Sequence, residues 1–226
     1  MTPTAIGEML GRRPTLIVPV GTTEQHGPHL PLGCDTIIVE RLADDLSAAF
    51  SVVRAPTLEF GVHAVLRPLP GSAALRHRTL HRVMNELIES WEDGAGVREF
   101  VILTAQLSEG HMEALSTIRT EEATVQVVDI FGLDFGPLLD QAGPIHGGEL
   151  DTSLLLYLAP ELARMDLALD FELTPRMLAR YRPGHVRRLP EGSPGSVGYP
   201  SLASAQKGEL LYKFILDRIS SYLAGN

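Results

Sequence analysis

Short apolar runs alternate along this chain with longer stretches in which apolar residues recur every three or four positions. The short runs are rich in β-branched residues and predict buried strands, at 15–21, 51–56, 100–104 and 125–131. The longer stretches predict helices, at 37–50, 75–91, 152–162 and 207–223, with another that begins within 112–119. Strands that alternate with helices indicate an α/β fold with a mainly parallel central sheet covered on both faces.

Proline and glycine refine this pattern. Pro19 lies inside the first apolar run, and because proline has no backbone N–H, we expect that strand to lose pairing near its C-terminal end. Gly94 and Gly96 are expected to end the helix at 75–91. The stretch 180–200, rich in Gly, Pro, Arg and Ser, predicts a loop that orders on assembly. Without internal repeats or low-complexity segments, residues 1–226 predict a single domain.

Composition narrows the classes of protein. The chain is 44% hydrophobic and 21% charged, which is ordinary globular usage. Its net charge of −9 disfavours a nucleic-acid partner. The single cysteine, Cys34, excludes an internal disulfide and fits a reducing compartment. No apolar run approaches the roughly 20 residues that span a bilayer, and the N-terminus lacks the features of a signal peptide. We therefore expect a cytoplasmic protein with no membrane partner.

Acidic residues and histidines that could bind a metal or act in catalysis follow the ends of two predicted strands. Glu24, His26 and Asp35 follow the first strand, and His111 and Glu113 follow the strand at 100–104. Ligands of parallel α/β sheets bind outside the carboxyl ends of the strands, so we expect both sets at one edge.

The first set has the composition of a metal site. Residues two apart in an extended loop point the same way, so Glu24 and His26 can address one side, and Asp35 follows nine residues after His26. Mixed imidazole and carboxylate ligands suit zinc, manganese or iron. The alternative is a loop with solvated charges.

The other histidines are weaker candidates. His111 and Glu113 are again two apart, but an ordinary helix start explains acidic residues there equally well. His146 precedes an apolar helix and is either a general acid/base or a capping loop residue. His29 is either a donor that supports the metal loop or a packed loop histidine. Five residues carry less weight: Cys34, which we expect to be a small buried residue, and four histidines that we expect at the surface or in structural roles, His63, His77, His81 and His185.

The longest motif is similar to one in the creatininase (creatinine amidohydrolase) family. It reads Val18-Pro19-Val20-Gly21-Thr22-Thr23-Glu24-Gln25-His26-Gly27-Pro28-His29-Leu30-Pro31-Leu32, followed by Asp35-Thr36. Shorter matches extend the resemblance over most of the chain, at Leu69-Pro70-Gly71-Ser72, at His146-Gly147-Gly148-Glu149-Leu150-Asp151-Thr152-Ser153 and at 199–209.

The resemblance implies a three-layer α/β/α sandwich, a homo-oligomer that is often a hexamer, and two divalent metals per chain that activate water against a C–N bond. By position, Glu24 would bind the first metal, His26 the second, and Asp35 would bridge them. His146 would be the catalytic histidine that passes a proton to the leaving nitrogen.

Two departures from the family pattern concern the remaining ligands. Counted from Gly96, Leu107 stands where most relatives have a metal-binding histidine. Alignment on Gly-His-x-Glu instead makes His111 and Glu113 the ligands, and we prefer this alignment. Asp151 stands where relatives usually have glutamate, and it is the alternative ligand.

The expected function is hydrolysis of an amide or cyclic amide C–N bond in a small molecule. Creatinine itself is a weak candidate, because the only tryptophan, Trp91, lies in a predicted helix. One alternative keeps the metals but takes a peptide or a formamide derived from a pyrimidine. The other is a non-catalytic pseudoenzyme with an eroded site.

Overall fold

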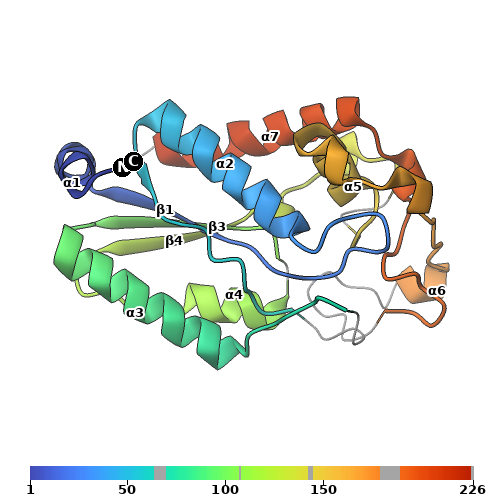
Figure 1. The fold of residues 1–226 in the computed structure, drawn as a ribbon, viewed down its shortest axis with the longest axis horizontal. Coiled ribbons are helices and arrows are strands. Elements are labelled where there is room, and N and C mark those ends of the chain that lie inside the picture. The colour runs from blue at the N-terminus through green and yellow to red at the C-terminus, as the bar shows by residue number, and fades with distance from the viewer. Residues whose placement is uncertain (64–69, 107, 142–144, 179–188, 225–226) are drawn as a thin grey trace.

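The computed structural model describes residues 1–63, 70–106, 108–141, 145–178 and 189–224. Its sheet contains β1 (Thr15–Val20), β2 (Val53–Arg54), β3 (Glu99–Thr104) and β4 (Thr124–Asp129). The strands are parallel and run in the order β2-β1-β3-β4 (Figure 1). The predicted parallel sheet is confirmed, with each strand at its predicted place.

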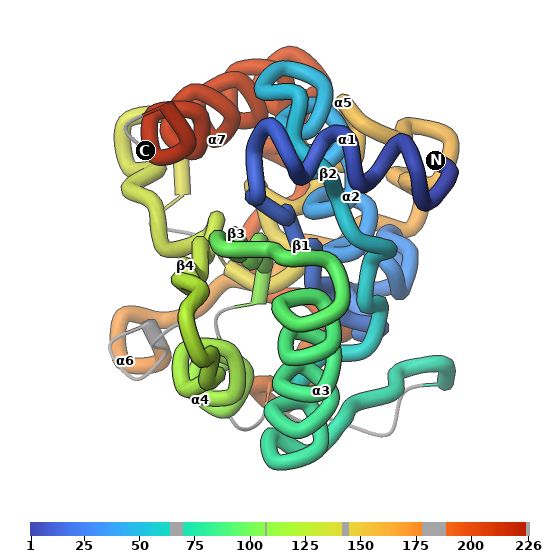
Figure 2. Tube along the Cα trace, turned by 90° about the vertical axis from the view of Figure 1, so that its left-hand side faces the viewer, coloured from blue at the N-terminus to red at the C-terminus, as the bar shows by residue number. Residues whose placement is uncertain are grey.

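Helices cover both faces of the sheet and form the three-layer sandwich (Figures 1 and 2). One face carries α2 (Cys34–Phe50), α5 (Glu149–Leu158) and α7 (Ala205–Ala224). The other carries α3 (His77–Ala95) and α4 (Glu109–Ser116). Two short helices lie outside these layers, α1 (Pro3–Arg12) and α6 (Pro175–Leu178).

Successive residues of the strands contribute to two separate cores. Ile17 and Leu103 pack with the layer of α2, α5 and α7, while Leu16 and Phe100 pack with the layer of α3 and α4. This alternation follows from the two-residue period of a strand. Because both faces are covered, the strands have the continuous apolar sequence of buried parallel strands.

Pro19 limits pairing on one side of β1 only. The register between β1 and β3 runs through Pro19 and Leu103 to Val20 and Thr104. On the β2 side, regular pairing ends at Ile17. The expected loss of pairing therefore concerns the β2 side, where pairing is interrupted after Ile17. It resumes beyond β2, since the N–H of Leu58 donates to the carbonyl of Pro19 at 3.0 Å.

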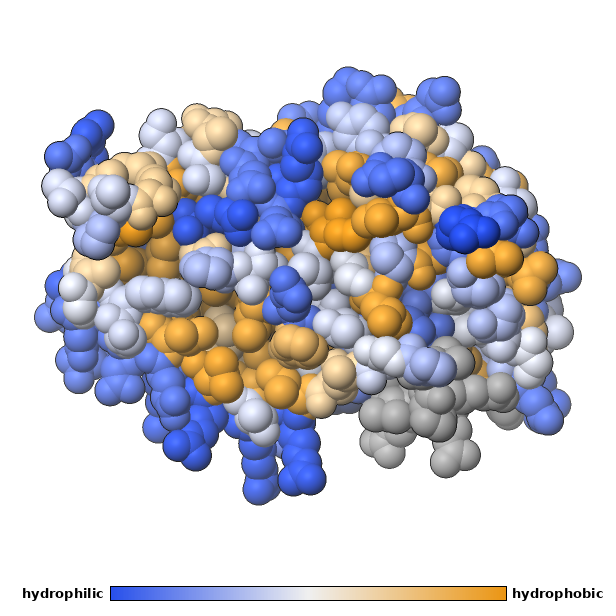
Figure 3. All heavy atoms as spheres, in the orientation of Figure 1, coloured by the Kyte–Doolittle hydropathy of each residue, from blue (hydrophilic) through white to orange (hydrophobic). Residues whose placement is uncertain are grey.

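On the face drawn in Figure 3, apolar patches lie scattered among hydrophilic side chains. Within the described part of the chain, no helix combines the length and the apolar character needed to cross a bilayer.

The predicted helix end at 94–96 is set by Gly96, whose φ of +68° is left-handed, while Gly94 is still inside α3.

Candidate metal centre

The carboxyl ends of β1, β2 and β3 meet the N-termini of α2 and α5 at one edge of the sheet. The end of β1 lies flush against the start of α2, since a Cβ on Gly21 would stand 2.6 Å from the Cα of Thr36. Only glycine permits this approach. It brings the loop with Glu24 and His26 next to Asp35 in the first turn of α2.

Glu24, His26 and Asp35 are brought together in this way and are almost completely buried. Nδ1 of His26 lies 3.1 Å from the carbonyl oxygen of Glu24, which only accepts hydrogen bonds, so Nδ1 carries the proton and donates it. Nε2 of His26 lies 3.2 Å from Oδ1 of Asp35. The other oxygen of Asp35, Oδ2, accepts a 2.5 Å hydrogen bond from the hydroxyl of Thr22.

The contact between His26 and Asp35 has the character of two metal ligands. Oδ1 of Asp35 is buried and has no hydrogen-bond partner. A ring with a pKa of about 10 is protonated at neutral pH, so a proton on Nε2 lies between the two atoms. Without that proton, Nε2 and Oδ1 are two acceptors that face each other. Such a pair is costly when buried unless a proton or a cation lies between them. The residues present therefore fit a divalent cation, and a ring that donates Nδ1–H to a backbone carbonyl is common among metal-binding histidines.

Three buried carboxyl groups, those of Glu24, Asp35 and Asp151, act on His26. Burial raises the pKa of Glu24 to about 8 and that of Asp151 to about 6. Burial lowers the pKa of His26, but the carboxylates of Asp35, Asp151 and Glu24 outweigh it and raise that pKa to about 10. The pKa of Asp35 is lowered, because His26 and Thr22 offset the effect of its burial. A cation is the natural occupant of such a site.

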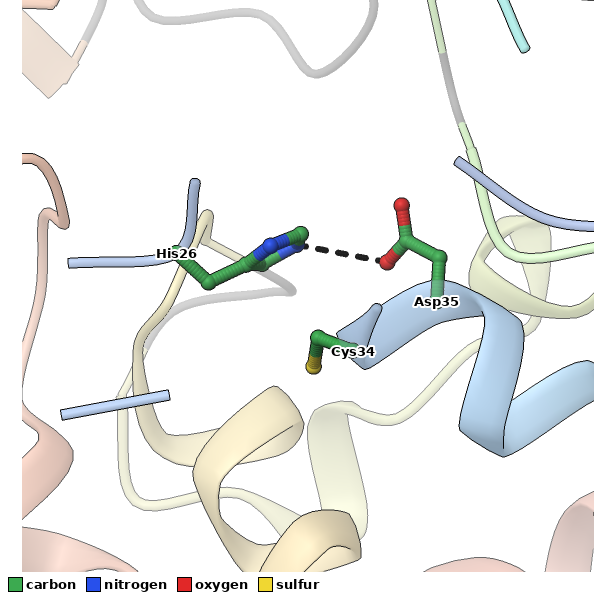
Figure 4. A group of neighbouring side chains, drawn as sticks. All are labelled: His26, Cys34 and Asp35. Atoms are coloured by element: carbon green, nitrogen blue, oxygen red, sulfur yellow. Dashed lines mark ion pairs between the residues drawn. The ribbon is translucent and has the colours of Figure 1, made fainter. Parts of the chain in front are cut away.

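Cys34 is the third residue whose ligand atom lies within 4.8 Å of those of His26 and Asp35. Figure 4 shows its sulfur pointing away from the line that joins the other two side chains. Burial raises the pKa of this thiol well above its usual value, and the nearby carboxylates add to the effect. Cys34 is thus a small, fully buried, protonated residue, as the sequence predicted.

His146 lies against the ring of His26. The two rings are 4.3 Å apart between centroids, and Nε2 of His146 donates to the carbonyl of Gln25 at 2.6 Å. Burial and the positive charge of His26 lower the pKa of His146 to about 3. Gly147 permits the approach, since its φ is +65° and a Cβ there would stand 2.7 Å from the carbonyl of His26.

Asp151 is close to the same centre. It is buried in the first turn of α5, and its Oδ2 accepts a 2.7 Å hydrogen bond from the backbone N–H of Gly147. It also contributes to the raised pKa of His26, so its charge acts at the metal centre.

His111 and Glu113 are not brought into this cluster. Both belong to α4, where residues two apart do not share a face, so His111 is buried and Glu113 is exposed. Nδ1 of His111 accepts from the N–H of Val62 at 3.1 Å, and Nε2 lies 2.9 Å from the hydroxyl of Thr104. Both ring nitrogens are therefore used within the protein. The expectation that His111 and Glu113 complete the ligand set requires an arrangement that this structure does not have.

Two residues of the centre were not singled out in the sequence. Gln106, just after β3, donates to Oε2 of Glu24 at 2.6 Å. His63, which the sequence assigned to the surface or to a structural role, is buried with Nδ1 3.5 Å from Oε1 of Glu24. His29 is buried, and its Nε2 lies 3.0 Å from the hydroxyl of Thr152 in α5, which agrees with either of the two roles expected for it.

Comparison with known proteins identifies relatives across the whole chain. It is 29% identical over 225 residues to the mycofactocin precursor peptide peptidase of Mycolicibacterium smegmatis, covering 93% of this chain and 86% of the relative. It is 25% identical over 228 residues to the creatinine amidohydrolase of Pseudomonas putida, covering 91% and 86%.

Solved structures share the fold. A zinc-zinc form of a mutant creatininase superimposes with a TM-score of 0.81 at 22% identity, over 99% of this chain and 95% of that one. A manganese creatininase superimposes with a TM-score of 0.78 at the same identity and coverage. The family model described as creatinine amidohydrolase matches residues 1–223. The chain therefore belongs to the creatininase family of hydrolases.

Proposed function

We propose that this chain is a metal-dependent hydrolase that cleaves the C–N bond of an amide or cyclic amide in a small molecule. The observation that carries the proposal is the contact of Nε2 of His26 with Oδ1 of Asp35 at 3.2 Å, buried beside two further carboxyl groups, those of Glu24 and Asp151. The zinc and manganese forms of similar creatininase structures support a divalent ion at this place. Following the family pattern, we expect two ions per chain.

Glu24, His26 and Asp35 would hold the metal. Asp151 is the better candidate for a further ligand than Glu113, because it is buried at the centre while Glu113 is exposed. A divalent ion in such a site supplies Lewis acidity and a nucleophile at neutral pH by lowering the pKa of water.

His146 is the residue that would move a proton. Its Nε2 holds a hydrogen that is donated to the carbonyl of Gln25, and its ring lies against His26. Because its pKa is about 3, the ring is neutral near pH 7 and acts first as a base. It would take up the proton that the attacking water releases and then pass a proton to the departing nitrogen of the substrate, and a histidine in this role contributes about 10²–10⁴-fold to the rate.

A peptide substrate is the second candidate. The peptide peptidase is 29% identical to this chain, against 25% for the creatinine amidohydrolase. Trp91 lies in α3 and packs in the core between that helix and the sheet, so it is not available to enclose a creatinine ring.

Metal analysis of the purified protein tests the proposal. We expect at least one divalent ion per chain, and its loss in the His26→Ala variant. Less than one ion per chain, unchanged by His26→Ala, would indicate the non-catalytic alternative and overturn both hydrolase functions. Product screening with creatinine, hydantoin-like rings, formamides and short peptides then separates the two substrate classes.

A homo-oligomer and a cytoplasmic location are also proposed. Large apolar side chains are exposed on α7 and on the segment that follows α5, among them Leu210 at 59% and Leu169 at 56%. Burial of such side chains between copies would favour association. Sedimentation analysis of the purified protein tests the oligomer.

A further inference from the structure

His63 is buried beside the metal centre although it is distant in sequence from the family motif. Its side chain and that of Glu24 are each 5% exposed, and Nδ1 of His63 lies 3.5 Å from Oε1 of Glu24. It reaches this place on the loop that follows β2, opposite the side of Glu24 that Gln106 contacts.

The backbone next to His63 is fixed from two sides. The N–H of Val62 donates to Nδ1 of His111 at 3.1 Å, and the carbonyl of Val62 accepts from the hydroxyl of Ser108 at 2.6 Å. Gly61 lies so close to the end of β1 that a Cβ would stand 2.8 Å from the carbonyl of Gly21. Contacts with His111 of α4, with Ser108 just before α4 and with Gly21 just after β1 therefore hold the backbone so that His63 points toward Glu24. This gives His111 a positioning role.

The distance between His63 and Glu24 suits two ligands of one ion. N–H···O hydrogen bonds have distances of about 2.7–3.2 Å, and those between charged groups are shorter. Ligand bonds of about 2.0–2.2 Å in tetrahedral geometry place two ligand atoms about 3.4 Å apart. The 3.5 Å separation between His63 and Glu24 matches the second value, whereas the 3.2 Å between His26 and Asp35 lies at the upper end of the first.

We infer that His63 is a metal ligand of this chain, paired with Glu24 on one side of the centre as His26 is paired with Asp35 on the other. The inference rests on the proposed function. It also accounts for Leu107, which stands where most relatives have a metal-binding histidine in the alignment counted from Gly96. The loop after β2 would supply the imidazole that the loop after β3 lacks.

The test uses cobalt(II) as the probe, because the position and intensity of its visible absorption report the number and type of ligands. Two variants remove the imidazole: His63→Ala leaves space, and His63→Phe keeps a ring of similar volume without a ligand atom. His77→Ala, on an exposed histidine at the start of α3, is the matched control. Thermal unfolding of each protein in chelator shows whether the metal-free fold is retained.

We expect both His63 variants to bind cobalt at least 100-fold more weakly, or to lose one ion per chain, with a changed absorption spectrum. Their metal-free melting temperatures and the control should match the wild type. Affinity within 3-fold of wild type with an unchanged spectrum would overturn the inference alone. Wild-type protein that binds no cobalt would overturn the proposed function, and the inference with it. If His63→Ala does not fold, His63→Phe decides between these outcomes.

Discussion

The side-chain amide of Gln106 lies 2.6 Å from Oε2 of Glu24, so a residue that follows β3 orients a carboxylate that follows β1. Rotation of this amide by 180° would break both of its hydrogen bonds, because its Oε1 accepts a 3.1 Å hydrogen bond from the backbone N–H of Ser108. Glu24 is thereby held with Oε1 directed to His63. Hydrogen bonds of this kind commonly set the geometry of metal-binding carboxylates.

Replacement of Gln106 by leucine should weaken metal binding without abolishing it. The carboxylate of Glu24 remains but loses its orienting donor, so we expect affinity to fall about 10–100-fold. Titration against a chelating dye measures this, with Gln206→Leu, an exposed glutamine of α7, as the control. Unchanged affinity in Gln106→Leu would show that the contact does not support the metal.

The sequence predicts the fold well because the spacing of apolar residues reflects which faces of each strand and helix are buried. Each strand is a continuous apolar run, since parallel strands are covered on both faces. The periodicity does not predict the helix α1, which contains Gly7 and Gly11 and buries only Leu10. It places the start of α5 three residues late, since buried Glu149 and Asp151 at its first turn are polar.

The site was predictable only where it is local in sequence. Glu24 and His26 lie two residues apart in one loop, and both are buried at the centre. At His111 and Glu113 the same spacing falls in a helix, where residues two apart point to different faces. Gln106 contacts Glu24 across 82 residues, and no local pattern reports such a contact.

Stability at acidic pH should depend on His111. Burial lowers the pKa of His111 to about 4 from an ordinary value of 6.5. Between these values the unfolded chain binds a proton that the folded chain does not. The free energy of unfolding therefore has its full value above pH 6.5 and falls as the pH falls toward 4. At pH 5 it should be roughly 2 kcal/mol lower because of this group.

The variant that tests this is His111→Gln, studied in chelator by urea unfolding at pH 7.5 and pH 5. We expect it to be less stable than wild type at pH 7.5 by about 1–3 kcal/mol, because buried hydrogen bonds are lost. Its further loss between the two pH values should be smaller than that of wild type by roughly 2 kcal/mol. An equal pH dependence in both proteins would contradict the assigned pKa. His77→Gln should behave as wild type.

Gly195 should tolerate alanine less well than Gly192 does. Both have positive φ, +114° and +84°, so both substitutions strain the backbone. A Cβ on Gly195 would also stand 2.4 Å from Oε1 of Gln25, whereas the nearest atom to a Cβ on Gly192 is 3.9 Å away. The side chain of Gln25 must then leave the carbonyl of Gly195 and the N–H of Gly27.

We expect Gly195→Ala to lower the free energy of unfolding by about 1–3 kcal/mol more than Gly192→Ala does, as measured by urea unfolding. The difference between the two variants removes the shared backbone strain and isolates the crowding. Equal stabilities would mean that Gln25 moves aside freely and does not hold this loop.

Close packing of α5 against α7 should make Gly208 irreplaceable. A Cβ on Gly208 would stand only 1.9 Å from the backbone carbonyl oxygen of Ser153, so the two helices must separate. Gly208→Ala should lower the free energy of unfolding by about 3 kcal/mol or more. Gly7→Ala in α1, where no atom lies within 4 Å, should instead stabilise the protein by about 0.5–1 kcal/mol. A neutral Gly208→Ala would contradict this helix packing.

His146 should be required for turnover but not for metal binding. Its ring lies against His26, but its Nε2 donates to the carbonyl of Gln25, so we expect it to carry a proton rather than to bind the ion. His146→Asn keeps a donor for that carbonyl and removes the titratable ring. With a substrate found by product screening, we expect kcat to fall about 10²–10⁴-fold. Metal content should stay at the wild-type value, and His77→Asn should retain full activity. A parallel loss of metal in His146→Asn would instead identify His146 as a ligand, since a proton carrier that does not bind the ion leaves its affinity unchanged.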